Sequence, residues 1–116
     1  RSMNENRIDL GAGHSMEFFS WAPDDLPANR ATFGFPLPDV PKAGLIIYHP
    51  DLKHPGAECV SGLHFDLPEL RRFPTSFPNS AVWQVESWEP LTISPSVLCM
   101  RCGDHGFIKA GRWVPA

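Results

Sequence analysis

GLIIYHP, residues 44–50, is the stretch of the sequence that most clearly predicts a strand. It is a compact apolar run with adjacent β-branched side chains, and the proline at its end stops it. Runs of this kind are typical of strands that are buried in a core. We therefore expect residues 44–50 to form a buried β-strand.

Proline limits helix formation along the whole chain, which has 13 prolines and nine glycines among 116 residues. Each proline removes a backbone donor and fixes φ, so few windows are long enough for a helix. Five prolines lie in 22–43, which we expect to be loop with a short extended piece at 31–35. Residues 66–74 predict one or two helical turns, with Asp66 as the cap.

Other segments favour strands through alternation or aromatic content. They are MEFFSW (16–21), CVSGLHFDLP (59–68), AVWQVESWEP (81–90) and GFIKAGRWV (106–114), the last as a terminal hairpin turning at Lys109-Ala110-Gly111. The predicted fold class is mainly β, an α+β fold with little helix. We expect a small single-domain sheet and hairpin fold that a zinc knuckle stabilises.

The length of 116 residues, with 42% hydrophobic and 20% charged side chains, predicts one globular domain. Arg1-Ser2 before Met3 has the look of an expression scar, so Met3 is the expected native start. We expect residues 1–15 to be a flexible N-terminus and residues 16–116 to form a single zinc-binding domain.

Charge and cysteine content narrow the class of protein. A formal charge of −3 and a pI near 5.9 argue against a general nucleic-acid or membrane-surface binder. No run is long and apolar enough for a membrane span, and no signal peptide is evident. Three cysteines, an odd count, favour thiols or metal ligands in a reducing cytoplasm over a disulfide framework. The expected location is therefore cytoplasmic.

The segment SPSVLCMRCGDHGFIKAGRW (94–113) contains the main chemical motif, Cys99-x-x-Cys102-Gly103. Two thiolates at this spacing on a tight turn both reach one zinc ion, and the glycine lets the backbone fold back toward them. The same motif serves redox chemistry, but that function needs a following helix, which two nearby glycines disfavour. In a third interpretation the cysteines simply pack in a core.

A structural zinc site needs four ligands, and the sequence offers five candidates: Cys59, His64, Cys99, Cys102 and His105. We favour Cys59, Cys99, Cys102 and His105, with His64 in reserve, and expect one Zn²⁺ per chain. His64 is equally explained as a half-buried strand histidine. His105 has an alternative role, a hydrogen bond to the site from outside the ligand set.

Other histidines and aromatic residues have simpler interpretations. His14 follows the glycine-rich stretch Gly11-Ala12-Gly13 and is expected to be solvated. His49 and His54 stand beside prolines and are expected to be turn residues. Trp83, Trp88 and Trp113 are expected to pack in the core or across strands. Trp21, beside a loop, is a candidate anchor for a protein partner.

Residues 83–114 resemble the family of domains of unknown function numbered 6527, which is found in bacteria and their phages. The matching positions are Ser94-Pro95-Ser96, Cys102, His105, Phe107, Ile108, Gly111 and Val114. Many members have an upstream His-x-Cys-x-Cys cluster, where this chain has only Cys59 and His64, so Cys99 is a candidate replacement. The closing pattern most resembles small proteins of actinobacterial phages. The resemblance implies a phage protein in the host cytoplasm, whereas other members accompany ubiquitin-like conjugation genes.

Three functions fit these features. The favoured one is a non-enzymatic, zinc-stabilised protein that binds a host or phage protein, as an accessory or anti-host factor. A homodimer is compatible with this function. The alternative is a zinc-dependent hydrolase or peptidase acting on protein tails, with Glu58 or Asp104 as base. A nucleic-acid knuckle is the third, supported only by Arg101, Lys109 and Arg112. Thiolate-rich ligation disfavours catalysis, so we lean toward a protein that is not an enzyme.

Overall fold

The structure is a computed structural model that describes residues 7–21, 40–68 and 82–116. This part of the chain is nearly all β, which confirms the mainly-β prediction. It holds no helix with the length and apolar character needed to cross a membrane. The strands are β1 (Ile8–Gly11), β2 (His14–Trp21), β3 (Val40–Pro50), β4 (Glu58–Phe65), β5 (Val82–Trp88), β6 (Leu91–Ser94), β7 (Val97–Leu98), β8 (His105–Lys109) and β9 (Arg112–Pro115).

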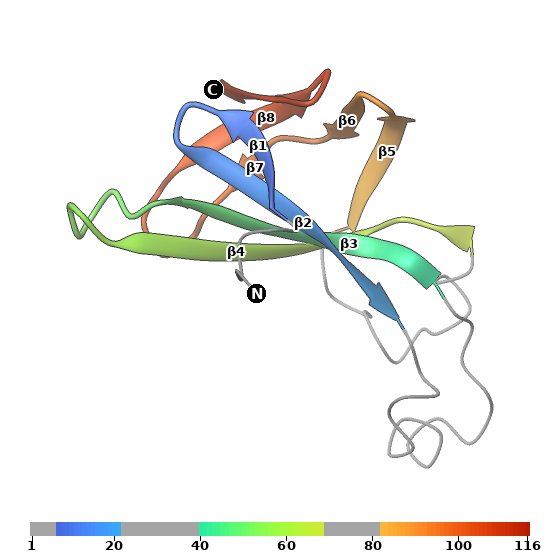
Figure 1. Ribbon diagram of the computed structural model, residues 1–116, viewed down its shortest axis with the longest axis horizontal. Coiled ribbons are helices and arrows are strands. Elements are labelled where there is room, and N and C mark those ends of the chain that lie inside the picture. Colours follow the sequence, from blue (N-terminus) through green and yellow to red (C-terminus); the bar gives the residue numbers. More distant parts are fainter. Residues whose placement is uncertain (1–6, 22–39, 69–81) are drawn as a thin grey trace, which may run out of the picture.

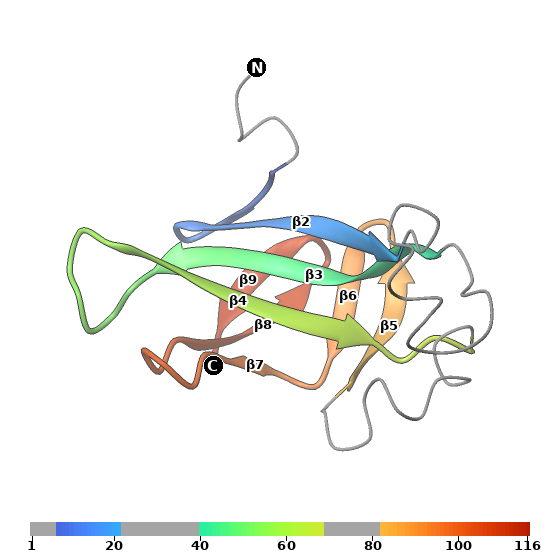
Figure 2. The same ribbon diagram turned by 90° about the horizontal axis from the view of Figure 1, so that it is seen from below.

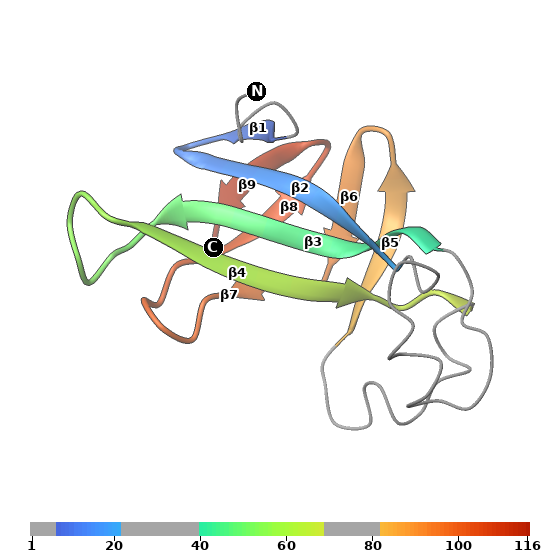
Figure 3. The same cartoon turned by 60° about the horizontal axis from the view of Figure 1, so that its bottom comes forward.

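The strands form two sheets that pack face to face. The larger sheet has the order β1-β2-β3-β4-β5-β6, and the smaller has the order β7-β8-β9. The pairs are antiparallel except for β4 and β5, which run parallel. The long strands β2, β3 and β4 lie side by side across one layer, with β8 and β9 behind them (Figures 2 and 3). The larger sheet curls, so that β1 approaches β9 and β6 approaches β8 (Figure 1).

The residue alternation of β3 explains its place at the centre of the larger sheet. Leu45 and Ile47 are fully buried, while the alternate side chains, Ile46 and Tyr48, are partly exposed on the other face. The predicted strand at 44–50 is therefore confirmed. The strand begins earlier, at Val40, so the prediction of loop up to residue 43 is wrong at its end.

The core lies between the two sheets. Its buried members come from both layers and are Leu10, Met16, Leu45, Ile47, Leu63, Phe65, Leu91, Ile93, Val97, Ile108 and Trp113. Trp113 is buried in the core as expected, and Trp83 packs against its edge. Trp88 is 43% exposed, and its ring packs edge-on against Phe65 with centroids 5.4 Å apart. The core thus joins the N-terminal strands to the terminal hairpin.

Glycines admit close packing at two strand positions. Phe19 pairs with Gly44 across β2 and β3, and its ring covers the glycine. A Cβ on Gly44 would lie 2.1 Å from the carbonyl oxygen of Leu63 and 2.4 Å from Phe19 Cζ, so only glycine fits. Trp113 covers Gly106 of β8 in the same way.

The terminal hairpin β8–β9 is confirmed, and Ala110 and Gly111 in its turn have positive φ values of 50° and 75°.

At the N-terminal end, the sheet begins at Ile8, whereas the single domain was expected to start at residue 16. Ile8–Gly11 pairs with the beginning of β2 through a turn in which Gly11, Ala12 and Gly13 all have positive φ.

Some sequence predictions fall on residues outside the described part of the chain. These are the loop and extended piece within 22–39, the helical turns after Pro68, and the side chain of Trp21 as a partner anchor. They remain predictions.

Candidate metal centre

The hairpin of β3 and β4 brings the first two side chains of the centre together. His49 pairs directly with Cys59 across the two strands, and both side chains point into the molecule. The connecting turn is closed by a backbone hydrogen bond from Asp51 N–H to the Ala57 carbonyl, 3.0 Å long. The Asp51 carboxylate accepts a further bond from Lys53 N–H at 2.9 Å. A short, internally bonded turn therefore fixes the register that makes His49 and Cys59 neighbours.

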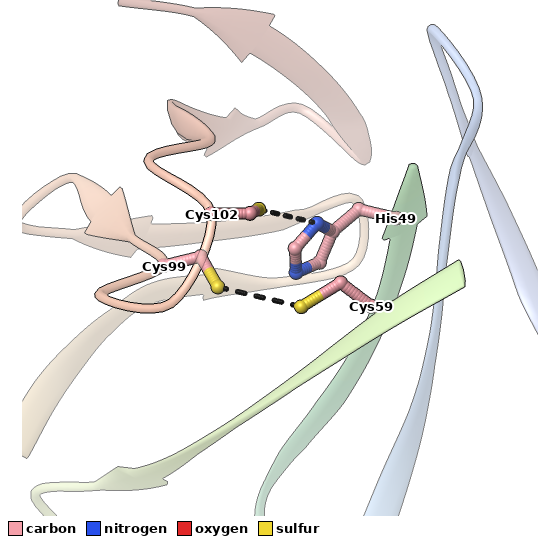
Figure 4. Close-up of side chains that lie close together, drawn as sticks. All are labelled: His49, Cys59, Cys99 and Cys102. Carbon is pink, nitrogen blue, oxygen red and sulfur yellow. Dashed lines mark hydrogen bonds between the residues drawn. The ribbon is translucent and has the colours of Figure 1, made fainter. Parts of the chain in front are cut away.

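The turn between β7 and β8 supplies the other two side chains, Cys99 and Cys102. Cys99 N–H donates to the Asp104 carbonyl, and Gly103 N–H donates to the Cys99 carbonyl, both at 2.8 Å. Gly103 has a φ of 85°, a conformation that glycine adopts without strain. This closed turn points both thiols at the β3–β4 hairpin (Figure 4). The knuckle geometry predicted for Cys99-x-x-Cys102 is present.

The four side chains form a compact cluster. One ligand atom from each of His49, Cys59, Cys99 and Cys102 lies within 4.8 Å of all the others. Cys59 Sγ is 3.6 Å from Cys99 Sγ, and Cys102 Sγ is 3.8 Å from His49 Nδ1. Around a tetrahedral zinc with Zn–S near 2.3 Å, sulfurs are about 3.8 Å apart and sulfur–nitrogen pairs slightly closer. The spacing therefore fits a single tetrahedral ion.

The cluster is shielded from water. His49 is 2% exposed, and the three cysteines are each between 5% and 7% exposed. Buried thiols and imidazole without a metal would leave polar groups only weakly satisfied in a nonpolar setting. Burial of this kind is typical of a closed structural site rather than of a site open to substrate.

The two thiols that face each other have opposite acidities. Burial raises the pKa of Cys59 to about 11, and the neighbouring Cys99 sulfur adds to the rise. Burial also acts to raise the pKa of Cys99, but hydrogen bonds from Ser61 and from the N–H groups of Cys102 and Arg101 lower it to about 6. Cys59 S–H then donates to the Cys99 thiolate. One ligand is thus already ionised at neutral pH, which favours binding of a cation.

Each nitrogen of the His49 ring has a partner outside the cluster. Nε2 lies 3.0 Å from Ser61 Oγ, while Nδ1 lies 3.1 Å from the Pro50 carbonyl and 3.4 Å from Asp104 Oδ2. A metal-binding histidine donates its second N–H to such a partner, which fixes the ring. Because Nδ1 is the nitrogen that faces the Cys102 thiol, Ser61 is positioned to receive the N–H of Nε2. Ser61 is also hydrogen-bonded to Cys99, so it contacts two members of the cluster.

A buried contact between His14 and Asp104 lies behind the knuckle. His14 Nδ1 lies 2.8 Å from the Ala12 carbonyl oxygen, and Nε2 lies 2.6 Å from Asp104 Oδ2. Hydrogen bonds at both ring nitrogens therefore fix the orientation of the imidazole. The His14 ring also stacks on Trp113, with centroids 4.1 Å apart. These contacts join the β1–β2 turn, the knuckle and the terminal hairpin.

Three of the five predicted ligand candidates meet in the cluster: Cys59, Cys99 and Cys102. His105 lies elsewhere, on the exposed side of β8, where its Nε2 is 2.9 Å from Ser96 Oγ. His64 is half-buried against Phe19, with ring centroids 5.1 Å apart. Burial lowers the pKa of His64, as expected for a histidine partly withdrawn from water.

The fourth member of the cluster, His49, was interpreted from the sequence as a turn residue, and that interpretation is wrong. The signal that identifies it is alternation: His49 follows Leu45 and Ile47 at intervals of two, on the buried face of β3. The expectation that His14 is solvated is also wrong, since it is 6% exposed. His54 does lie in an exposed turn, beside Asp51.

The two carboxylates considered as catalytic bases are both engaged. Glu58 forms a double hydrogen bond with the Arg7 guanidinium at 3.0 and 3.2 Å. Asp104 is paired with His14, as described above. A surface depression of about 310 Å³ lies beside His49 and is lined by Gly13, His49, Pro50, Gly56, Ala57 and Glu58. Among these lining residues, Glu58 carries a carboxylate.

No family model, curated protein or solved structure matches the chain. The chemistry of the centre is therefore read from its side chains. Three thiols and one imidazole, buried and at tetrahedral spacing, are a ligand set able to hold a metal ion, and they suit zinc. Soft sulfur ligands disfavour magnesium and calcium, which bind oxygen.

Proposed function

We propose that the chain is a zinc-stabilised protein-binding module without catalytic activity. The observation that carries the proposal is the buried cluster of His49, Cys59, Cys99 and Cys102. Four protein donors complete a tetrahedral zinc site, so no position is left for a water molecule or substrate. Zinc bound there would act by holding parts of the fold together.

The position of the cluster explains why the fold would need a metal. Two of its members come from strands of the larger sheet and two from the turn between β7 and β8 of the smaller sheet. The core between the sheets is small, as in most domains of this length, and an added crosslink stabilises such domains. At a free zinc concentration of a thousand times Kd, binding stabilises the folded state by about 4 kcal/mol.

A zinc hydrolase is the alternative against which the proposal is tested. It would need a metal-bound water and a carboxylate within reach of it. Three thiolates donate charge to zinc and oppose the lowering of the pKa of a bound water. The pairing of Glu58 with Arg7 and of Asp104 with His14 also supports a non-catalytic role.

Location and partner belong to the proposal as well. Free thiols with a low pKa survive best in a reducing compartment, so we propose a cytoplasmic protein. The resemblance to phage proteins makes a host or phage protein the proposed class of partner, with nucleic acid less favoured because the chain is acidic overall.

The test is replacement of the metal with Co²⁺, whose visible spectrum reports coordination. The proposal predicts intense tetrahedral d–d bands and sulfur-to-cobalt charge transfer, both unchanged when azide is added. A spectrum that shifts with azide would show an open position and would favour the hydrolase. Glu58→Gln is the matched variant: it leaves the cobalt spectrum unchanged if Glu58 has no role at the metal.

A further inference from the structure

The outer face of the smaller sheet has an unusual composition. Alternation along β7, β8 and β9 points Val97, Gly106, Ile108 and Trp113 into the core. The remaining side chains form the outer face, which we define as Leu98, His105, Phe107, Lys109, Arg112 and Val114. This face lies on the side of the sheet away from β2, β3 and β4.

Apolar side chains occupy the centre of the outer face. Phe107 pairs directly with Val114, and Leu98 pairs with His105, two residues from Phe107 on β8. Leu98 is 48% exposed and Val114 is 38% exposed, so water covers much of this apolar surface. At the tip of the adjacent knuckle, Met100 is 85% exposed. Neighbouring exposed apolar side chains of this kind mark interaction surfaces more often than scattered ones do.

The two charged side chains of the outer face, Lys109 and Arg112, are both positive. Lys109 Nζ lies 4.5 Å from the centroid of the Phe107 ring, and Lys109 pairs with Arg112 across the hairpin. None of the six side chains of the outer face is a carboxylate. The only acidic residue in 97–116, Asp104, points inward to His14. The face is therefore cationic in a chain whose formal charge is −3.

We propose that the outer face docks an acidic, extended segment of another protein. Apolar side chains of the segment would pack on Leu98, Phe107 and Val114, and its carboxylates would lie near Lys109 and Arg112. Complementary charge steers and orients such an encounter, and the apolar centre excludes water from it. The inference rests on the proposed function, because the knuckle that the metal would hold leads directly into β8.

A peptide fits this face better than a nucleic acid does. Single-stranded nucleic acids bind through several aromatic side chains on which bases stack. The outer face has one phenylalanine, flanked by aliphatic side chains that match apolar side chains of a peptide.

The experiment measures fluorescence anisotropy with a short labelled peptide that alternates glutamate with leucine and phenylalanine. Three further probes accompany it: the peptide with lysine for glutamate, the peptide with serine for leucine and phenylalanine, and oligothymidylate. Lys109→Glu is compared with Lys53→Glu, and Leu98→Ser with Leu52→Ser, because Lys53 and Leu52 are exposed in the β3–β4 turn and are not part of the outer face. Zinc content and oligomeric state are measured on the same samples.

The proposal predicts that the acidic apolar peptide binds most tightly and that salt weakens it. Lys109→Glu and Leu98→Ser each weaken binding by about tenfold or more, while the two turn variants do not. Equal weakening by the turn variants, tighter binding of oligothymidylate, or an oligomer that Lys109→Glu dissociates would each overturn it. A zinc-loaded protein that binds no peptide would overturn the docking proposal alone. A zinc-free protein that binds with the predicted pattern would contradict only the zinc proposal.

Discussion

His49 and Cys59 are direct neighbours across the β3–β4 hairpin, and both side chains are buried on its inner face. This pairing places an imidazole and a thiol beside the two thiols of the knuckle between β7 and β8. The proposed zinc would thus connect the β3–β4 hairpin of the larger sheet to a turn of the smaller sheet.

Loss of His49 should remove the metal. His49→Ala deletes one of four ligands from a buried site, and the remaining three thiols leave the ion incomplete. We expect zinc affinity, measured by competition with a chromophoric chelator, to fall at least about a hundredfold, an effect larger than is usual for residues outside the ligand set.

His105→Ala is the matched control, because the spacing of Cys102 and His105 also suggests a ligand. The exposed position of His105 beside Ser96 predicts that zinc affinity stays unchanged. A larger loss with His105→Ala than with His49→Ala would refute the ligand set proposed here.

Ser61 should hold the His49 ring. Ser61→Ala removes the acceptor beside Nε2 and the hydrogen bond to Cys99, so zinc affinity should fall by about tenfold or more. Ser20→Ala, at an exposed position of β2, is the control and should have no effect.

Asp104→Asn tests which nitrogen of the His49 ring binds the metal. If it weakens zinc binding more than Ser61→Ala does, Nε2 rather than Nδ1 binds the metal.

The thiols should differ in reactivity once zinc is removed with a chelator. Cys99 has a pKa lowered to about 6, so its reactive thiolate forms as the pH rises through that value. Cys59 has a pKa raised to about 11 and stays protonated until alkaline pH. Iodoacetamide at pH 7.5 should therefore label Cys99 well before Cys59.

Mass spectrometry of tryptic peptides measures this labelling. Cleavage after Arg101 separates Cys99 from Cys102, so each of the three thiols is followed individually. Equal labelling rates for Cys59 and Cys99 at neutral pH would contradict the asymmetry. Zinc-loaded protein should resist labelling at all three positions.

Gly44→Ala should destabilise the fold. The added Cβ would meet the Leu63 carbonyl and the Phe19 ring, so β3 or the ring must shift, at a cost of about 2 kcal/mol or more. Gly62→Ala is the control on the neighbouring strand, where the nearest atom is 3.9 Å away, and should change stability by less than about 1 kcal/mol. Denaturant unfolding measures both, and equal effects would show that the close approach is not what limits the site.

Local patterns in the sequence were sufficient to predict several strands and the terminal hairpin, but not β1 or the beginning of β3. Alternation in AVWQVESW and the apolar run at 44–50 depend on neighbours in the chain, and both correspond to strands of the structure. The knuckle turn is local as well, since Cys99, Cys102 and Gly103 lie within five residues. These features needed no knowledge of how strands pair.

His49, the fourth ligand candidate, is placed beside Cys59 by the pairing of β3 with β4. The spacing of residues in the sequence does not reveal that pairing. His105 is close to Cys102 in sequence, but it begins β8, and the alternation of that strand turns it to the same exposed face as Phe107. His49 is distant in sequence, and the adjacent Pro50 suggested a turn. The strand in fact continues to Pro50, which keeps His49 on the buried face.

The contact of His14 with Asp104 joins residues 90 positions apart, and nothing in GAGHS indicates it. The tight β1–β2 turn, with three successive positive φ values, brings His14 to the start of β2 and under Trp113. Such contacts follow from the stacking of the two sheets and become visible only in three dimensions.

X-ray absorption at the zinc edge, on protein purified without added metal, tests the central claim most directly. We predict one zinc per chain, with three sulfur ligands at about 2.3 Å and one nitrogen ligand at about 2.0–2.1 Å. The nitrogen shell should disappear in His49→Ala and persist in His105→Ala. Absence of zinc, or a shell with two sulfurs and bound water oxygen, would contradict a closed site made by His49, Cys59, Cys99 and Cys102.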